Sequence, residues 1–521
     1  MTISTGNFKA YDPLIIFGIS VFCVLTAMLV SLAPMKFSIG IVLGIAVFLI
    51  VLVNLRLGLF LIVFSMLLSP ELTVYEGGGG RLEASKPITI RVEDLILLLI
   101  CAVWLVKTSV FDHIKVGYKT GINKYIFIYM GIVFISTFFG ILTDKVSFKS
   151  GFFFTIKYLE YFVLFFMTVN IIKTTGDKKY VEQLINAMFI TAFIVCLYAI
   201  ATMGTGSGRA SAPFEGEVGE PNTLGMYLII IGALAYGLIY NKIGAIKEHR
   251  LWGLIFILFI PFLATLSRVS YVALIPTLFM FGYLSKHKVW FVLCTGLLIF
   301  VLPLTIPLMK QQIKNLYSQE VKKMTQDIGQ KVDSSATARI EKFFEDLTSK
   351  SWDRILYTFT QQEKKWRRQA RVLGARVDTS TTARIESWQK VARDFIDNPL
   401  LGTGTTGYAF VDGQYIKVLI ESGLLGLAAF FTLIYQILKR SIHIYRSAVT
   451  PYYKGIALGF VCSLVGMITH ALASNTFIII RIMEPFCLLM GIVFMIPYLE
   501  SLDKKQTPVE EQAPSAGRII N

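Results

Sequence analysis

Long apolar runs recur along the whole chain and constrain its fold more than any other feature. The first of them, "PLIIFGISVFCVLTAMLVSLA", has no charged residue, and similar runs follow with polar links between them. An apolar helix of about 20 residues crosses the roughly 30 Å hydrocarbon layer of a bilayer, and a helix bonds all of its own backbone polar groups. Because 55% of the 521 residues are hydrophobic, the sequence predicts an all-α polytopic membrane protein.

The runs predict about fourteen transmembrane helices in one bundle. The expected spans are residues 13–33, 37–54, 57–70, 94–110, 125–142, 152–172, 183–203, 223–240, 251–266, 270–284, 289–308, 414–437, 455–473 and 478–498. Residues 1–308 then form a bundle of about eleven spans, and 412–498 add about three. Residues 309–411 are expected to be a mainly helical extracytoplasmic loop, and 499–521 a disordered cytoplasmic tail.

The net charge of +16 is interpreted link by link, because lysine and arginine in short loops mark the cytoplasmic side of a membrane protein. Five basic links fall on one side of the predicted bundle: "DHIKVGYKTGINK", "KTTGDKKYVE", "NKIGAIKEHR", "SKHK" and "KRSIHIYR". Both termini join that side. The positive charge is thus assigned to membrane topology and anionic lipid, and no nucleic-acid partner is expected.

Irregular segments collect on the opposite, extracytoplasmic face. They are residues 71–93, the loop "GTGSGRASAPFEGEVGEPN", the break "LSRVS" and the long loop 309–411. The long loop contains two similar stretches, "VDSSATARIEKF" and "VDTSTTARIESW", which we interpret as a local duplication with a hydroxyl-capped helix start in each copy. Loops of this kind on one face indicate a working surface there.

Arg268 lies in "TLSRVSYVALI", inside one of the most apolar parts of the chain. A charge at the bilayer centre costs roughly 3 kcal/mol or more. The side chain either extends from a helix end to the interface or lines a polar cavity and binds an anion, where its planar fork suits phosphate. In the second case Ser267 and Ser270 would add hydroxyl donors.

Arg209 lies in a Gly- and Pro-rich loop before a span that begins near Pro221, with Asn222 beside it. Proline at the first position of a helix is favourable, and the free amides of a helix start attract anions. The alternative is an ordinary surface loop with one arginine close to three glutamates.

A third polar segment is "NPLLGTGTTGYAFVDGQYIKVLIESGLLG", in which glycines allow tight turns before a span. Asp412, Tyr415 and Glu421 follow along it, although Tyr415 and Glu421 are not on one helix face by i+4 spacing. They are candidate site residues without a predicted dyad.

Two charge pairs within spans, Lys157 with Glu160 and Arg481 with Glu484, are predicted to be structural ion pairs. The six cysteines have unrelated spacings that indicate neither a disulfide framework nor a zinc site. The sequence has no nucleotide-binding loop and no acidic metal motif. We therefore expect a reaction without a metal or other cofactor.

The order of these motifs resembles the O-antigen polymerase and O-antigen ligase superfamily, the Wzy-type proteins. The resemblance covers roughly Arg209 to Gly426, through "R…PN", "LSR", a long outer loop, "R…W…NPLLGTG" and "D-x-x-Y…E-x-G-L-L-G". It implies a GT-C-like membrane glycosyltransferase that acts on the outer face of the bacterial inner membrane. The implied substrates are glycans carried on undecaprenyl pyrophosphate, with a flippase and a chain-length regulator of the same pathway as further partners.

Carried over by motif, the resemblance places Arg209 and Arg268 on the pyrophosphate, where they would stabilise the charge that develops as it leaves. Ligases of this family typically have a histidine, in an "HN" pair, where this chain has Asp412 and Gly413. This difference favours a polymerase, with Asp412 as the candidate general base. Glu421 is the reserve candidate, and Arg384 is expected to contact substrate from the outer loop.

The resulting hypothesis is a polymerase of a surface polysaccharide such as O-antigen, capsule or exopolysaccharide. An O-antigen ligase or a protein O-oligosaccharyltransferase is the first alternative. A lipid-linked oligosaccharide flippase is the second, although such transporters usually show repeated halves, and we find no such symmetry.

Overall fold

The structure is a computed structural model that describes residue 44 and residues 47–75, 88–107, 119–202, 209–214, 220–242, 245–285, 379–408 and 411–506. The expected spans 13–33 and 289–308, the loop residues 309–378 and the tail from residue 507 onward lie outside the described residues. The first copy of the duplicated stretch lies outside them too.

The described elements are almost all helices. In chain order the helices are α3 (Leu55–Leu68), α4 (Val92–Val106), α5 (Asn123–Leu142), α6 (Phe148–Thr175), α7 (Lys178–Ala201), α8 (Pro221–Tyr240), α9 (Ala245–Ala264), α10 (Arg268–Ser285), α14 (Thr379–Asp394), α15 (Gln414–Ser447), α16 (Pro451–His470) and α17 (Ile480–Gln506), with the short 3-10 helices η2 (Phe395–Asp397) and η3 (Thr476–Ile478).

Eight of the described helices are long and apolar enough to cross a membrane: α5, α6, α7, α8, α10, α15, α16 and the Ile480–Leu502 part of α17. The shorter α3 is also apolar. The prediction of an all-α polytopic membrane protein is therefore confirmed, while the number of fourteen spans stays a prediction.

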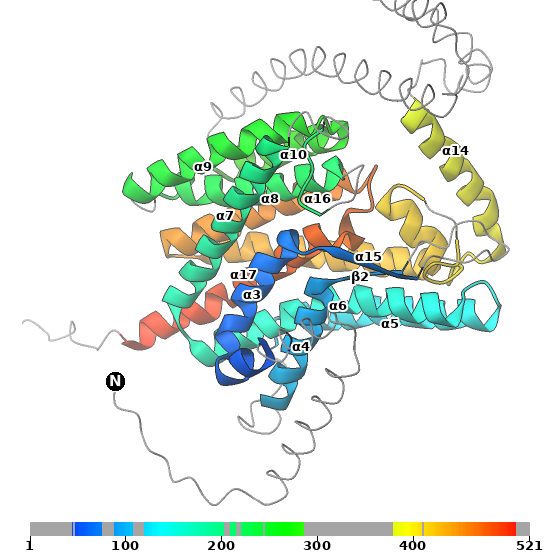
Figure 1. Ribbon diagram of the computed structural model, residues 1–521, viewed down its shortest axis with the longest axis horizontal. Helices are drawn as coiled ribbons and strands as arrows, with labels where there is room; N and C mark the ends of the chain where they lie inside the picture. The colour runs from blue at the N-terminus through cyan, green and yellow to red at the C-terminus, as the bar shows by residue number, and fades with distance from the viewer. Residues whose placement is uncertain are drawn as a thin grey trace, which may run out of the picture.

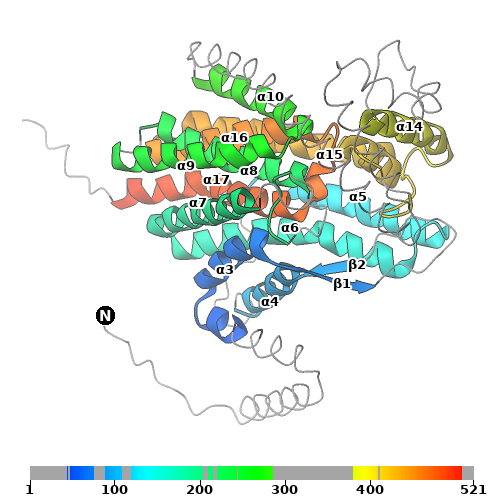
Figure 2. The ribbon, with the colours of Figure 1, turned by 45° about the horizontal axis from the view of Figure 1, so that its top comes forward.

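The long helices stack side by side with roughly parallel axes (Figure 2), and α14 lies at the edge of the bundle in both views (Figures 1 and 2). The centre of the bundle is formed by α8, α16 and α17. In the apolar 18-residue stretch of each helix, 83%, 72% and 89% of the residues are buried, respectively. In contrast, only 28% of the residues in the corresponding stretch of α10 are buried. An outer helix such as α10 exposes apolar side chains that suit contact with lipid.

One short sheet interrupts the helical pattern. Strands β1 (Glu71–Tyr75) and β2 (Ile88–Arg91) pair antiparallel, in the segment that was expected to be an irregular outer loop. β2 leads directly into α4, where the backbone N–H of Arg91 donates to Asp94 Oδ2 at 2.9 Å. This bond satisfies a donor before the first helical turn.

Helix α15 has a break at Gly423, where the backbone is left-handed (φ 67°, ψ −167°). The segment 398–407, which contains most of "NPLLGTGTTG", packs against the break and bonds to both sides of it. Thr403 N donates to Ile420 O (2.9 Å) and Gly404 N to Glu421 O (2.8 Å), while Leu424 N donates to Pro399 O (2.9 Å). An irregular backbone is tolerated at membrane depth only when protein satisfies its polar groups, which this segment does.

The bundle has two chemically different ends. At the basic end, Lys247 lies 3.7 Å from Glu182, and Tyr498 donates to the carbonyl of Lys173. The opposite end, here called the site end, joins the start of α8, the break between α9 and α10, the end of α16 and the start of α15, as the contacts below show. All the candidate site residues except Glu421, which lies further along α15, belong to the site end or to α14 beside it.

Candidate anion and acceptor site

The break between α9 and α10 creates the first part of the site. Helix α9 ends at Ala264 and α10 begins at Arg268, so the break predicted at "LSRVS" is confirmed. Leu266 within it adopts a positive φ of 49°, a conformation that costs about 1–3 kcal/mol in a residue other than glycine. Such strain needs support from the surrounding structure, and the break also leaves carbonyl groups without helical partners.

Arg209 supplies that support. Its Nε donates to Thr265 O at 2.9 Å and its Nη2 to Leu266 O at 3.2 Å, while Ala210 N donates to Ala264 O at 2.9 Å. Burial lowers the pKa of the Arg209 guanidinium, and the charge of Arg268 lowers it further. The two arginines predicted to share a site are therefore neighbours, and a bound anion would relieve the repulsion between them.

The two serines and Asn222 are joined in one hydrogen-bonded chain. Ser267 Oγ donates to Asn222 Oδ1 at 2.7 Å and lies 2.7 Å from Ser270 Oγ. Ser267 also caps α10, because its Oγ accepts from the backbone N–H of Ser270 at 3.2 Å. The side chain of Arg268 is exposed at the first position of this helix, where the helix dipole favours anions.

His470 extends this chain and was not predicted to belong to it. It is fully buried at the end of α16, with Nε2 3.4 Å from Ser270 Oγ and Nδ1 2.7 Å from Thr476 Oγ1. Position 470 falls inside the expected span 455–473. Its place as the last residue of a span that ends on the face of the other motifs was the available signal.

The segment after His470 connects this first part to Asp412. Gln414 N donates to Ala471 O at 2.9 Å, and Asn475 Nδ2 donates to Val411 O at 2.8 Å. Asp412 therefore lies on a turn that is bonded to residues immediately following His470. At the site end, the short segment that begins at His470 thus lies between the serine chain and the turn that carries Asp412.

Helix α14 packs over this turn and fixes Asp412. Arg384 Nε lies 3.3 Å from Asp412 Oδ2, and Trp388 Nε1 donates to Asp412 O at 2.7 Å. Both charged side chains stay partly exposed, at 20% for Arg384 and 36% for Asp412. An ion pair open to solvent is worth about 1 kcal/mol or less, so a substrate group could displace Arg384 at little cost.

Tyr415 and Glu421 have protein partners. The Tyr415 hydroxyl donates to Ile468 O at 2.6 Å. Glu421 is buried, and its Oε1 accepts from Lys417 Nζ and from the backbone N–H of Thr406. It lines a small cavity together with Tyr158, Thr405 and Gln414. Their roles as substrate contacts stay predictions, since the observed bonds hold α15 in place.

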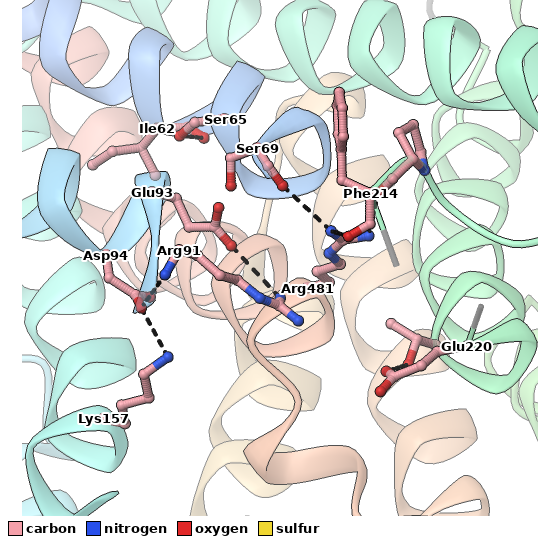
Figure 3. A network of polar contacts seen from close by, with 12 residues as sticks. Ile62, Ser65, Ser69, Arg91, Glu93, Asp94, Lys157, Phe214, Glu220 and Arg481 are labelled. Carbon is pink, nitrogen blue, oxygen red and sulfur yellow. Dashed lines mark hydrogen bonds and ion pairs between the residues drawn. The ribbon is translucent and has the colours of Figure 1, made fainter. Parts of the chain in front are cut away.

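The predicted ion pair of Lys157 with Glu160 is wrong, and the pair of Arg481 with Glu484 stays a prediction. Lys157 pairs with Asp94 of α4, with 2.8 Å between Nζ and Oδ2, rather than with Glu160 on its own helix (Figure 3). Arg481 donates to the backbone carbonyls of Ser69, Pro213 and Phe214. Packing between helices offered both cations partners that lie far away in sequence.

Within the described ranges, no group of three or more His, Cys, Asp or Glu side chains could hold a metal ion. The site end has two guanidiniums, two buried serine hydroxyls and an amide on one side, and a partly exposed aspartate on the other. The fold and this site define a multi-pass membrane protein with a candidate anion site at one end of its bundle.

Comparison with known proteins finds a family match for part of the chain. Residues 253–431 match the family described as O-antigen ligase, which is consistent with the O-antigen polymerase and ligase superfamily that the motifs of the chain resemble. This stretch includes Arg268, both serines, Arg384 and Asp412, while Arg209 and Asn222 precede it and His470 follows it. No curated protein matches the sequence.

Proposed function

We propose that this protein is a polysaccharide polymerase of the bacterial inner membrane. It transfers a growing glycan from undecaprenyl pyrophosphate to a sugar hydroxyl of a lipid-linked repeat unit. The observation that carries the proposal is the proximity of Arg209 and Arg268 at the break between α9 and α10, within or beside the family domain.

In this reaction the acceptor hydroxyl oxygen forms a new bond to the anomeric carbon of the donor glycan. The bond from that carbon to the pyrophosphate oxygen breaks, and its electron pair leaves with the lipid pyrophosphate. Arg209 and Arg268 stabilise the charge that develops there, which is the role of preorganised donors in catalysis. The hydroxyl proton passes to the carboxylate of Asp412, acting as general base.

Two features support the extracytoplasmic orientation of this site. The basic links lie at the opposite end of the bundle, which the positive-inside rule places in the cytoplasm. The site end also borders α14, the described end of the long loop that we propose to be an extracytoplasmic subdomain. Both termini would then be cytoplasmic, and the flippase and chain-length regulator of the pathway would be the partners in the membrane.

A ligase is the second candidate, favoured by the description of the matching family. A ligase would transfer a finished glycan once to a different acceptor, such as lipid A core or protein. The aspartate at position 412, in place of the histidine typical of the ligases, supports the polymerase instead. The two reactions share the donor and the leaving group, so the same arginines would serve both.

The test uses the full chain purified in nanodiscs with a lipid-pyrophosphate-linked repeat unit and EDTA, with product length followed on a gel. We expect a ladder of products from the wild type, and a loss of about 10²–10³ in rate for Arg268→Ala and for Arg209→Ala. Arg250→Ala is the matched control, because this exposed arginine lies near the start of α9, at the basic end.

Each outcome decides between functions. Single transfer to an added acceptor, without a ladder, would identify a ligase. Full-length polymer from either arginine variant would remove the proposed anion site. A wild-type protein that transfers no glycan to either acceptor would overturn the enzyme assignment.

A further inference from the structure

Arg481 is a fully buried arginine that the proposed reaction does not use. It is 1% exposed, at the second position of α17, and its guanidinium donates to three backbone carbonyls. Nη1 bonds to Pro213 O at 2.7 Å, and Nη2 bonds to Phe214 O at 3.3 Å and to Ser69 O at 3.4 Å (Figure 3). Burial of a charge costs several kcal/mol unless it is paired and hydrogen-bonded, so these contacts need a compensating charge.

That charge comes from an ionic cluster, defined as Arg91, Glu93, Asp94, Lys157, Glu160, Arg481 and Glu484. Glu93 is 1% exposed and interacts electrostatically with Arg481. Lys157 pairs with Asp94 at 2.8 Å, and Arg91 lies 3.6 Å from Glu93. Within this cluster Glu93 acts on Arg481 through space, while Nη1 and Nη2 of Arg481 donate to the three carbonyls.

Two of those carbonyls belong to the same short segment as Arg209. Residues 209–214 are held at their start by the bonds of Arg209 and Ala210 to the α9–α10 break. Arg481 holds their end. Phe214 has a φ of 58°, which is unfavourable for a bulky residue and persists only where the surroundings impose it.

We propose that Arg481 is a positioning residue for the anion site. By bonding the turn at 213–214 to α17 and the end of α3, it keeps the side chain of Arg209 in position beside Arg268. This inference rests on the proposed function, because it takes the two arginines to bind pyrophosphate. It adds a residue that touches neither substrate nor the reacting atoms, and that lies outside the matched family domain.

The role depends on the shape of the side chain as well as its charge. A planar guanidinium can donate to two adjacent carbonyls and to a third from another helix, whereas a lysine ammonium is a single point charge. Arg481→Lys therefore keeps the charge of the cluster and loses the clamp. Lys157→Met is the matched control: it also breaks a buried ion pair of the cluster, and Lys157 has no described contact with residues 209–214.

The experiment measures the response of the full chain in nanodiscs to inorganic pyrophosphate, without requiring any transfer. The probe stabilises the protein against heat by an amount that depends on the logarithm of its concentration relative to Kd, and the apparent Kd is obtained from Tm against concentration. We expect Arg481→Lys to weaken pyrophosphate binding by about tenfold to a hundredfold, comparable with other losses of positioning. Lys157→Met should stay within about twofold of the wild type, even if its Tm falls equally.

Wild-type affinity in Arg481→Lys would overturn the inference. Equal weakening in Lys157→Met would also overturn it, because the effect would then be general loosening of the cluster. If Arg481→Lys does not fold, it is replaced by the double variant Arg481→Gln with Glu93→Gln. This variant removes one cation and one anion together, and we expect the same loss of pyrophosphate affinity. A wild type that binds no pyrophosphate, or an Arg209→Ala variant that binds it normally, would instead contradict the proposed function.

Discussion

At the scale of single residues, the candidate site combines a fixed cation, Arg209, with an exposed cation, Arg268, and a partly exposed carboxylate, Asp412. Arg209 is held by two carbonyls, whereas Asp412 is joined to Arg384 at 3.3 Å and stays partly exposed. A leaving anion benefits from donors that do not need to reorganise. A general base must instead reach the proton of an incoming acceptor, which suits a carboxylate that stays partly exposed.

Asp412→Asn tests the assignment of the base. The amide keeps the size of the side chain and removes its ability to take a proton, so we expect a fall of about 10²–10⁴ in kcat with an unchanged Tm. Asp394→Asn is the control, because Asp394 also lies at the α14 end of the site and accepts a hydrogen bond from Tyr408 at 2.6 Å. Equal turnover in Asp412→Asn and the wild type would assign the base to another group.

At the scale of elements, two interrupted helices build the site end. The break before α10 places Arg268 at a helix start and exposes the carbonyls that Arg209 binds. The break in α15 is filled by residues 398–407, which connect α14 to the turn that carries Asp412. Interruptions at membrane depth are expensive unless every freed group is bonded, so each one here has a dedicated partner segment.

Gly423→Ala tests the importance of the break in α15. A Cβ there would lie 2.1 Å from Leu400 O, at a backbone φ of 67° that alanine avoids. We expect a loss of stability of about 2 kcal/mol or more, seen as a lower Tm in detergent. Gly131→Ala in α5 is the control, since nothing lies within 4 Å of its added methyl and helix propensity improves there by up to about 1 kcal/mol. Similar Tm values for the two variants would contradict this account.

At the scale of the whole molecule, the two ends of the bundle differ in charge and in chemistry. The links between α6 and α7 and between α8 and α9 are basic, and contacts such as Lys247 with Glu182 bring them together. The arginine and serine groups of the candidate site lie at the other end. If the positive-inside rule holds for this chain, the site faces away from the cytoplasm.

Single cysteines introduced at exposed positions test that orientation. Lys149→Cys lies near the start of α6. Lys179→Cys lies near the start of α7, just after the other end of α6. We expect a membrane-impermeant thiol reagent to label Lys149→Cys in intact cells, and Lys179→Cys only after permeabilisation. The parent chain is the control for labelling of its native cysteines, and the reversed pattern would place the site in the cytoplasm.

The membrane class, the break at "LSRVS" and the order of the family-like motifs follow from the amino-acid sequence alone. These features depend on local hydropathy, helix length and residue order, which need no knowledge of partners. Ser267 bonds to Asn222 and lies beside Ser270, and Arg209 bonds to the break that precedes Arg268. That these residues form a substrate site stays a prediction.

Which polar groups contact one another depends on how the helices pack. Lys157 pairs with Asp94 on α4 instead of the nearby Glu160, Arg481 bonds to carbonyls more than 260 residues away in the chain, and His470 joins the serine chain. In a low-dielectric interior a charged or polar group takes whichever partner lets it be fully bonded. Helix packing selects that partner, and residue spacing along one helix does not reveal it.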